Sequence, residues 1–475
     1  MKKLVEIITK ILPIKTKILN IGNVQMDSRK IEKDDIFFAL NSGKNYIPQV
    51  LEKGASLVIC DDKKWEGHEK VVVVEDTLKA MQEIAKEYRK SLPVKIIGIV
   101  GSNGKTTTKD IVYSVLSSKY KCVKTEGNYN NHIGVPYTLL QIKENDEFAV
   151  VEMGMSSRGE IKFLCETALP DYGIITNIGD SHLEFLLNRE NVFIEKSEIK
   201  NYVDKDRLII FGDDFYLKNL DGIITNIGDS HLEFLLNREN VFIEKSEIKN
   251  YVDKDRLIIF GDDFYLKNLN GIKVGFEKNN NFIIENYTET SEGVSFEIEK
   301  EKYNFEMNGK HNCINAAFGT VIGKIAGLSY EEIERGLENC KVTPMRFQKI
   351  EKNGIKYIND SYNASPVSMR YSLETLADAY KGILKIAVLA DMGELGKDEL
   401  KYHIEVLEYA VALDIEKIIV FGNIMKEAAE KIENREKLII AETKEEIKNI
   451  IRKDFADRVV LIKGSNFNHL WEIME

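Results

Sequence analysis

The chain has 475 residues, and its 77 Asp and Glu residues outnumber 66 Lys and Arg to give a formal net charge of −11. With 43% hydrophobic and 30% charged residues, the composition is typical of a folded globular protein and excludes a disordered or collagen-like chain. The acidic balance argues against binding to nucleic acid or to an anionic membrane through bulk charge. The length predicts about two to four domains.

The N-terminal segment has the pattern of an amphipathic helix. Lys2 and Lys3 precede apolar residues at helical spacing, but Glu6 and Lys10 interrupt the continuous apolar core that a signal peptide requires. No apolar run approaches the length of about 18 residues that predicts a membrane span. We therefore expect a cytoplasmic protein.

The five cysteines are scattered and show no CxxC spacing. This pattern predicts reduced, mostly buried thiols and neither a disulfide framework nor a zinc site.

A block of sequence occurs twice in tandem without a single change. Gly173–Leu220 recurs as Gly222–Leu269, with a period of 49 residues, and Asp221 joins the two copies. Solenoid repeats diverge and recur several times. We therefore interpret the block as a recent tandem duplication, or an error in assembling the sequence, and not as a two-repeat architecture.

Apolar patterns divide the chain into three predicted domains, 1–93, 94–343 and 344–475, with boundaries near Leu92-Pro93 and Thr343-Pro344. The first contains short strand-like runs and then a helical stretch: Ile36–Leu40, Ser56–Cys60, Val71–Val74 and Thr77–Lys90. The second contains two buried-strand runs, the duplicated block 173–221/222–270 and a helical pattern over Ile314–Ala326.

The third region alternates strand runs with helical stretches. The strand runs are Lys385–Leu389, Lys417–Phe421 and Val459–Lys463. Such alternation indicates βαβ units and a parallel sheet, so the fold class is predicted to be α/β.

The segment Gly101-Ser102-Asn103-Gly104-Lys105-Thr106-Thr107 predicts a phosphate-binding loop. It follows the strand run Lys95–Val100 and precedes a helix with an apolar face, which is the context that a P-loop requires. Backbone N–H groups of such a loop point at phosphates, Lys105 would reach the β- and γ-phosphates, and Thr106 would offer its hydroxyl to Mg²⁺. The full spacing asks for a glycine where Ile99 stands, and the alternative is a glycine turn without a ligand.

A second strand run, Phe148–Met153, carries the carboxylate of Glu152 near its end. Ligands of parallel α/β sheets bind at the carboxyl ends of strands, so Glu152 is a candidate ligand of the same metal. Downstream, Asp180, His182 and Glu184 follow another strand run, Gly173–Ile178. The P-loop alone does not define a reaction, but the absence of an Asn-Lys-x-Asp sequence argues against a GTPase.

Several further segments, taken with this P-loop, resemble the Mur ligases of peptidoglycan synthesis. The matching segments cover most of the chain: Asp27-Ser28-Arg29, Gly127–Pro136, His311–Ala317, Asp360–Pro366, Asp391–Gly396 and Lys463-Gly464-Ser465. The Asp360–Pro366 stretch discriminates within the family and favours the branch that adds D-alanyl-D-alanine. The resemblance implies a three-domain architecture with a central P-loop ATPase-like parallel sheet and a C-terminal Rossmann-like domain.

The resemblance also implies an activity and its substrates. It predicts an ATP-dependent amide ligase that joins D-alanyl-D-alanine to the tripeptide carboxylate of UDP-MurNAc-tripeptide through an acyl phosphate. A carboxylate is a poor electrophile, and phosphorylation by ATP supplies a leaving group for attack by the amine. ATP and Mg²⁺ are the implied cofactors, the partners are these small molecules and no nucleic acid, and we expect a monomer.

Site residues follow from the same matches. The implied ATP contacts, beside the P-loop, are Asn312, Asn315, Arg346, Asp360 and Asn363. The implied substrate contacts are Ser28, Arg29, Asn130, Asn131, Lys463 and Ser465. Lys463 and Ser465 could contact either phosphate or the incoming dipeptide. The Asp and Asn residues have an alternative interpretation as helix caps and turn residues.

The resemblance implies that Lys196 is carbamylated and that His182 binds a second Mg²⁺. A carbamate formed from CO₂ would supply anionic oxygens where an ammonium would repel the metal. The alternative for Lys196 is a solvated helix lysine. The second copy repeats the pair as His231 and Lys245, and we expect the first copy to bind the metal while the surplus copy lowers solubility.

Two other functions remain open from the sequence. One is another Mur-type or folylpolyglutamate-type ligase, and the other is a non-catalytic nucleotide-binding protein inactivated by the duplication.

Overall fold

The computed structural model describes residues 2–14, 21–100, 105–155, 159–175, 199, 202, 208–210, 258–260, 272–276, 281–380, 382–393, 395, 399–454 and 458–475. Its contacts group the chain into two compact units. Unit 1 comprises Met1–Val100, Tyr120–Ile174 and Glu195–Leu208, and unit 2 comprises Gly101–Lys119, Ile175–Ile194 and Ile209–Glu475. The boundaries of the three predicted domains stay a prediction.

Unit 1 begins with a small parallel sheet. Its order is β1 (Val24–Gln25), β2 (Ile36–Phe38), β3 (Leu57–Cys60) and β4 (Val71–Val73). Short helices connect these strands: 3-10 turns at Ser28–Lys30, Asn41–Tyr46 and Lys63–Trp65, and α2 at Ile47–Glu52. The core of this sheet is apolar and includes Phe37, Val50 and Val58.

Helix α3 (Thr77–Ser91) links this sheet to the rest of unit 1. Asp76 caps it by accepting hydrogen bonds from the backbone N–H groups of Leu78 and Lys79. The helix packs against α1 (Lys2–Ile11), α5 (Gly134–Gln141) and α6 (Glu160–Ala168). Arg89, near its end, donates to Asp171 at 2.8 Å and to the carbonyls of Ala168 and Leu169.

The central sheet has the order β6 (Cys122–Lys124), β7 (Phe148–Glu152), β5 (Lys95–Val100), β8 (Tyr172–Ile175) and β9 (Leu208–Ile210). Strand β5 runs parallel to β7, which runs parallel to β6. Its central strands are continuous apolar runs, as expected of a sheet covered on both faces.

Unit 2 contains α4 (Lys105–Ser117), which packs against α11 (Lys310–Ile325) and α12 (Tyr330–Glu338). Two three-stranded sheets belong to the same unit. One is parallel, with β10 (Ile258–Phe260), β11 (Ile272–Gly275) and β12 (Phe282–Ile283). The other is antiparallel, with β13 (Glu285–Thr290), β14 (Gly293–Ile298) and β15 (Glu301–Phe305).

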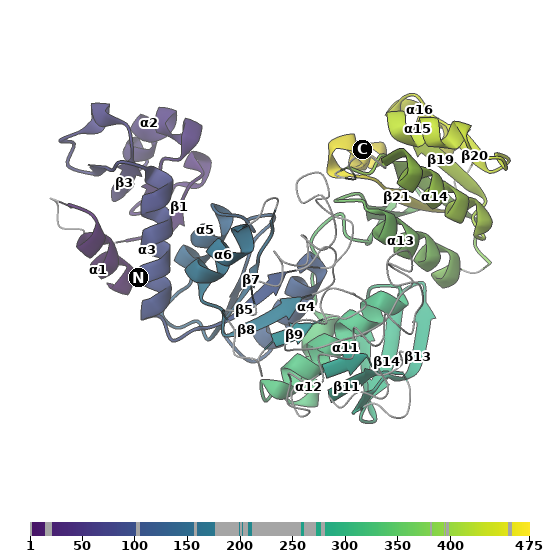
Figure 1. The fold of residues 1–475 in the computed structure, drawn as a ribbon, viewed down its shortest axis with the longest axis horizontal. Helices are drawn as coiled ribbons and strands as arrows, with labels where there is room; N and C mark the ends of the chain where they lie inside the picture. Colours follow the sequence, from purple (N-terminus) through teal and green to yellow (C-terminus); the bar gives the residue numbers. More distant parts are fainter. Residues whose placement is uncertain are drawn as a thin grey trace. The chain divides into compact units, whose positions relative to one another are not determined.

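The C-terminal part of unit 2 is a six-stranded sheet flanked by helices (Figure 1). The strand order is β16 (Gln348–Lys352), β17 (Ile355–Asp360), β21 (Val459–Lys463), β18 (Lys385–Ala390), β19 (Lys417–Phe421) and β20 (Leu438–Ile440). The helices are α13 (Pro366–Ala379), α14 (Glu399–Ala412), α15 (Asn423–Glu430) and α16 (Lys444–Asp454), with 3-10 turns at Asn466–Asn468 and Leu470–Met474.

The predicted α/β class with parallel sheets is confirmed, with one correction in the last region. The sheet there is not entirely parallel, because β16 pairs antiparallel with β17. The turn between them is Asn353-Gly354, and both residues have a left-handed φ, at 55° and 76°. This two-residue loop matches the twist of a hairpin, so the chain reverses there and does not cross over.

All five cysteines are free thiols, and Cys60, Cys165 and Cys313 are buried, as expected. None of the helices within the described residues is both long enough and apolar enough to cross a membrane.

The first copy contributes most of β8 and the whole of β9, and the second copy contributes β10. Strand β9 of the first copy lies at the edge of the central sheet, and β10 of the second copy pairs in parallel with β11. The same apolar sequence is therefore used twice, once next to β8 and once next to β11. A chain with one copy would contain this apolar strand sequence once, so only one strand would be available for the positions next to β8 and next to β11.

Deleting one copy tests this interpretation. Removal of 173–221 gives one chain, and removal of 222–270 gives another. The two chains differ only in the residue before Gly271, which is Asn270 in the first and Asp221 in the second, so each is the control for the other. We expect both to be more soluble and to melt at a higher temperature than the full chain, because fewer strand edges stay exposed. Equal solubility and equal melting temperature in all three chains would contradict the interpretation.

Candidate active site

A pocket in unit 2 lies at the carboxyl ends of β17 and β21. It encloses about 620 Å³ of empty space, including its open mouth. Its wall combines α4, α11, the loop before β16, and the start of α13. Seven predicted site residues line it: Thr107, Asn312, Asn315, Arg346, Asp360, Asn363 and Lys463. Ligands of open α/β sheets bind at this end of the strands, which makes the pocket the candidate site.

Arg346 is held in a loop of strained backbone. Met345 and Phe347, on either side of it, have left-handed φ values of 63° and 51°, which non-glycine residues rarely adopt. The guanidinium lies 4.1 Å from the ring centre of Tyr362, and the Tyr362 N–H donates to the Met345 carbonyl at 3.2 Å. The loop geometry therefore fixes the direction of one cationic side chain.

A buried carboxylate on α4 anchors the start of this loop. Asp110 is 1% exposed, and its Oδ2 accepts from the backbone N–H of Thr343 at 2.8 Å and from the Thr343 hydroxyl at 2.7 Å. Asp110 is thus tied to the chain three residues before Arg346. No sequence motif marks Asp110, so sequence reasoning missed its role.

The Arg346 side chain reaches the helix that follows the P-loop. Its Nη2 lies 3.4 Å from the Thr106 hydroxyl, and its Nε is shielded from solvent without a hydrogen-bond partner in the described part of the chain. A shielded N–H without a partner costs free energy, of the order of 1–3 kcal/mol. An anionic ligand in the pocket would satisfy it.

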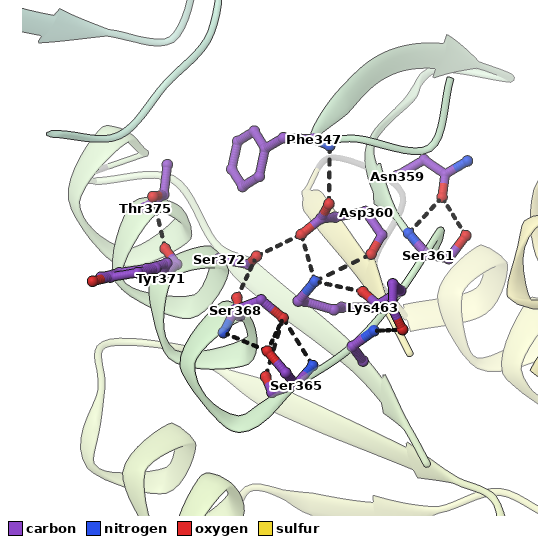
Figure 2. Close-up of polar contacts among 12 residues, drawn as sticks. Phe347, Asn359, Asp360, Ser361, Ser365, Ser368, Tyr371, Ser372, Thr375 and Lys463 are labelled. Carbon is purple, nitrogen blue, oxygen red and sulfur yellow. Dashed lines mark hydrogen bonds and ion pairs between the residues drawn. The ribbon is translucent and has the colours of Figure 1, made fainter. Parts of the chain in front are cut away.

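A second, partly buried carboxylate anchors the other side of the Arg346 loop (Figure 2). Asp360 Oδ1 accepts from the backbone N–H of Phe347 at 3.1 Å, and Oδ2 accepts from the Ser372 hydroxyl at 2.6 Å. The ammonium of Lys463 donates to the same Oδ2 at 2.7 Å. Burial lowers the pKa of Lys463, while the Asp360 carboxylate opposes that shift. Three separate segments thus converge on one carboxylate.

The asparagines of α11 lie at its first turns. Asn312 is 3% exposed, and its side chain donates to the Asn308 carbonyl at 2.7 Å. Its Oδ1 is 3.4 Å from the side-chain nitrogen of Asn315, which also lines the pocket. Both residues therefore present amide groups at the start of a helix, where a positive dipole favours anions.

The P-loop itself is only partly described. Gly101, Ser102, Asn103 and Gly104 lie outside the described residues, and Lys105 is the first residue of α4. Thr106 and Thr107 follow it and are both buried. The predicted strand and helix on either side of these residues are present, because β5 ends at Val100 and α4 begins at Lys105.

The predicted metal ligand Glu152 ends β7 in unit 1. It is 2% exposed, and its Oε1 accepts from the side chain of Asn130 at 2.9 Å. Asn131 accepts from the backbone N–H groups of Ile133 and Gly134, at 3.1 and 3.0 Å, so its carbonyl oxygen shapes the start of α5. Position 134 needs glycine, because a Cβ there would lie 2.3 Å from the backbone of Tyr129.

The predicted uridine-side residues lie on an exposed turn of unit 1. Arg29 makes a bidentate contact with Asp27, at 2.9 Å from Nε and 2.8 Å from Nη2, which lowers the pKa of Asp27 to about 2. The ammonium of Lys53 donates to the Ser28 carbonyl at 2.9 Å. The turn therefore presents a fixed cationic side chain.

Ser465 braces the loop that follows β18. Its hydroxyl accepts from the Gly393 N–H at 2.9 Å, and its own N–H donates to the Asp391 carbonyl at 3.0 Å. His403 supports the same loop from α14, because its Nε2 accepts from the Met392 N–H at 2.8 Å. Its Nδ1 lies 2.7 Å from the Glu399 carbonyl, so the ring is neutral with the proton on Nδ1.

Several predicted residues cannot be placed. His182, Lys196, His231 and Lys245 lie outside the described residues. Among the residues that are described, no three His, Cys, Asp or Glu side chains cluster as a metal site.

The pocket brings together features expected of a nucleotide-dependent enzyme: the helix that follows the predicted P-loop, a shielded arginine, amides at a helix start and the Asp360 carboxylate. This combination suits the binding of a phosphorylated nucleotide, because the cations and the helix dipole stabilise anionic charge.

Comparisons with known proteins agree with this class. The family described as "Mur ligase middle domain" matches residues 99–222 and again 216–323, and "Mur ligase, glutamate ligase domain" matches 345–466. The chain therefore belongs to the Mur ligase family.

Individual relatives support the same assignment. The UDP-N-acetylmuramoyl-tripeptide–D-alanyl-D-alanine ligase of Bacillus subtilis (strain 168) is 33% identical over 471 residues, covering 96% of this chain and 93% of the relative. The fold is shared with MurF from Acinetobacter baumannii, at a TM-score of 0.77 and 24% identity, with 99% and 97% of the two chains covered. It is also shared with MurF ligase from Thermotoga maritima in complex with ADP, at 0.72 and 24%, with 97% and 98% covered.

His403 gives the C-terminal region a predictable pH dependence. Burial lowers the pKa of His403 below its ordinary value of 6.5, although Asp391 and Glu399 oppose the shift. The unfolded chain therefore takes up a proton near pH 6.5 that the folded chain refuses, so this contribution to stability is present above that pH and is lost as the pH falls.

Urea unfolding at about pH 7.5 and about pH 5.5 measures this contribution, which reaches about 1.4 kcal/mol per pH unit. His403→Gln, which keeps one donor and one acceptor but does not titrate, should show a smaller loss of stability on acidification. An unchanged loss in the variant would contradict the assignment of a neutral buried histidine.

Proposed function

We propose that the chain is an ATP-dependent ligase that joins D-alanyl-D-alanine to the tripeptide carboxylate of UDP-MurNAc-tripeptide, a step of peptidoglycan precursor synthesis. The name of the Bacillus subtilis relative, at 33% identity over nearly the full length of both chains, supports this activity. The observation that carries ATP use is the pocket that unites Arg346, Asn312 and Asp360.

The reaction needs an activated carboxylate. Transfer of the γ-phosphoryl group of ATP to the tripeptide carboxylate gives an acyl phosphate, and the dipeptide amine then displaces inorganic phosphate to form the amide. Both reactants of the first step are anionic, so positioned cations must offset their repulsion. In our proposal the cations of this chain are Lys105 and Arg346.

The other pocket residues have proposed roles in holding the nucleotide. The P-loop residues Gly101–Thr107 bind its phosphates, and Asn312 and Asn315 contact its adenosine side. Asp360 and Asn363 shape the wall that the C-terminal region supplies. The shielded Nε of Arg346 supports the proposal that the phosphates of the nucleotide lie near this side chain. A phosphate oxygen is the kind of hydrogen-bond acceptor that this Nε lacks.

We propose four substrate contacts in unit 1, which are Ser28, Arg29, Asn130 and Asn131. We also propose that Ser465 contacts the dipeptide. The exposed guanidinium of Arg29 suits an anionic group such as the diphosphate of the uridine nucleotide. The side chain of Ser465 also braces its own loop, so any contact it makes would be fixed in direction.

Mg²⁺ fits the chemistry of the donors present. Thr106 offers a hydroxyl and Glu152 a carboxylate, both hard oxygen ligands on buried side chains. We propose these two as ligands of one ion and His182 as a ligand of a second. Bound Mg²⁺ supplies positive charge that neutralises the phosphates during transfer.

We also propose that Lys196, or Lys245 in the second copy, is carbamylated and that the first copy is the active one. The family resemblance supports this modification, and both lysines lie outside the described residues.

A substrate-dependence assay tests the proposed activity. Phosphate release from ATP should require both UDP-MurNAc-tripeptide and D-alanyl-D-alanine, and Lys105→Ala should lower it about 100-fold or more, because charge neutralisation at the phosphates is lost. Lys79→Ala, an exposed lysine on α3, is the control and should keep full activity. Release supported by glutamate and a folate would identify the folylpolyglutamate-type alternative, and no release with any acceptor would favour the inactivated protein.

Paired lysine variants test the copy and the carbamate together. Lys196→Ala should abolish activity and Lys245→Ala should retain it. Depleting CO₂ should lower the activity of Lys245→Ala, and bicarbonate should restore it. The reverse pattern would assign the second copy, and indifference to CO₂ would contradict the carbamate.

A further inference from the structure

Lys463 has no donor left for a substrate. It is 1% exposed, and its ammonium has one acceptor for each of its three N–H bonds. These acceptors are Asp360 Oδ2 at 2.7 Å, the Asn363 carbonyl at 3.1 Å and the Asp360 carbonyl at 3.4 Å. A contact with the incoming dipeptide, which the sequence had indicated, would require breaking one of them.

Through these acceptors, Lys463 connects two neighbouring parts of the pocket wall. Asp360 and Lys463 end the neighbouring parallel strands β17 and β21 and are register partners (Figure 2). The ammonium therefore fixes the end of β17 through Asp360 and the turn that follows it through Asn363. Ser372, from α13, adds a second donor to the same carboxylate oxygen.

The effect extends to Arg346 through the second oxygen of Asp360. Oδ1 accepts from the backbone N–H of Phe347, whose left-handed backbone needs an external restraint. Without the ammonium, the Asp360 carboxylate would keep one hydroxyl and one N–H as donors and would lose the cation with which it pairs. We expect the carboxylate then to turn toward solvent, which weakens its hold on the Arg346 loop.

We propose that Lys463 is a positioning residue for the nucleotide, which acts through Asp360 on the Arg346 loop and through Asn363, and that it does not contact the dipeptide. This inference takes ATP and the dipeptide as substrates from the proposed ligase function. The contacts of Lys463 in the pocket do not depend on that function.

The chain offers a matched control in the same sheet. Lys385 is also buried, at 3% exposed, and also pairs with a carboxylate, Asp414, at 2.9 Å. It lies at the opposite end of the sheet, because Lys385 pairs with Val459 at the start of β21 whereas Lys463 ends that strand. Replacing either lysine by methionine removes a buried ammonium, but only one replacement affects the pocket.

The experiment compares Lys463→Met and Lys385→Met in the full chain. We expect Lys463→Met to raise the KM for ATP and the dissociation constant of a non-hydrolysable ATP analogue about tenfold or more, with the KM for D-alanyl-D-alanine changed less than about twofold. Lys385→Met should leave all three values unchanged, and thermal unfolding reports the stability of each variant. A selective rise in the KM for the dipeptide would overturn the proposal.

A double variant distinguishes positioning from direct contact. Asp360→Asn keeps an oxygen for the Phe347 N–H and removes the charge, so Lys463→Met should add little to its effect on nucleotide affinity. Independent, multiplicative effects would contradict an action through Asp360. If the unmodified chain binds the ATP analogue but forms no amide, the ligase proposal fails while the nucleotide constants still test Lys463.

Discussion

The partly buried carboxylate of Asp360 is the constraint on which the geometry of the candidate nucleotide pocket depends. A carboxylate in this position is stable only with several donors, and here they come from β21, from α13 and from the loop before β16. Each donor orients one wall of the pocket. These hydrogen bonds offset the free-energy cost of removing the charge from water, and they fix three segments of the chain at once.

Arg346 shows how this constraint leads toward chemistry. Asp110 holds the chain before it and Asp360 holds the chain after it, and its guanidinium packs on Tyr362. A single arginine on a free loop would lose conformational entropy whenever it bound a phosphate. Here that entropy is lost on folding, so in the proposed reaction the side chain would be preorganised to stabilise the charge of a transferring phosphoryl group.

Much of the fold could be predicted because the strands are apolar runs of ordinary length. The runs 95–100, 417–421 and 459–463 are strands with those same bounds, and the stretch 77–90 is helical to Ser91. The hairpin at Asn353-Gly354 was missed although its two-residue turn is a strong local signal. The course of the duplicated block was not predictable, because two identical sequences compete for the same partners.

The candidate site was predictable where motifs mark it and not where tertiary contacts create it. Asn312, Asp360 and Asn363 belong to recognisable segments, Arg346 follows the predicted boundary at Thr343-Pro344, and the structure brings all four to one pocket. Asp110, Ser372 and His403 carry no motif, because their roles come from backbone N–H groups and side chains distant in sequence. For Lys463 the motif was seen, but only the structure shows that its donors are occupied.

A crystal structure of the protein with a non-hydrolysable ATP analogue tests the central claim most directly. The account predicts the adenosine beside Asn312 and Asn315, a phosphate oxygen on the Arg346 guanidinium, and Asp360 still bonded to Phe347 and Lys463. A nucleotide bound outside this pocket, or an Asp360 carboxylate released from both partners, would contradict it.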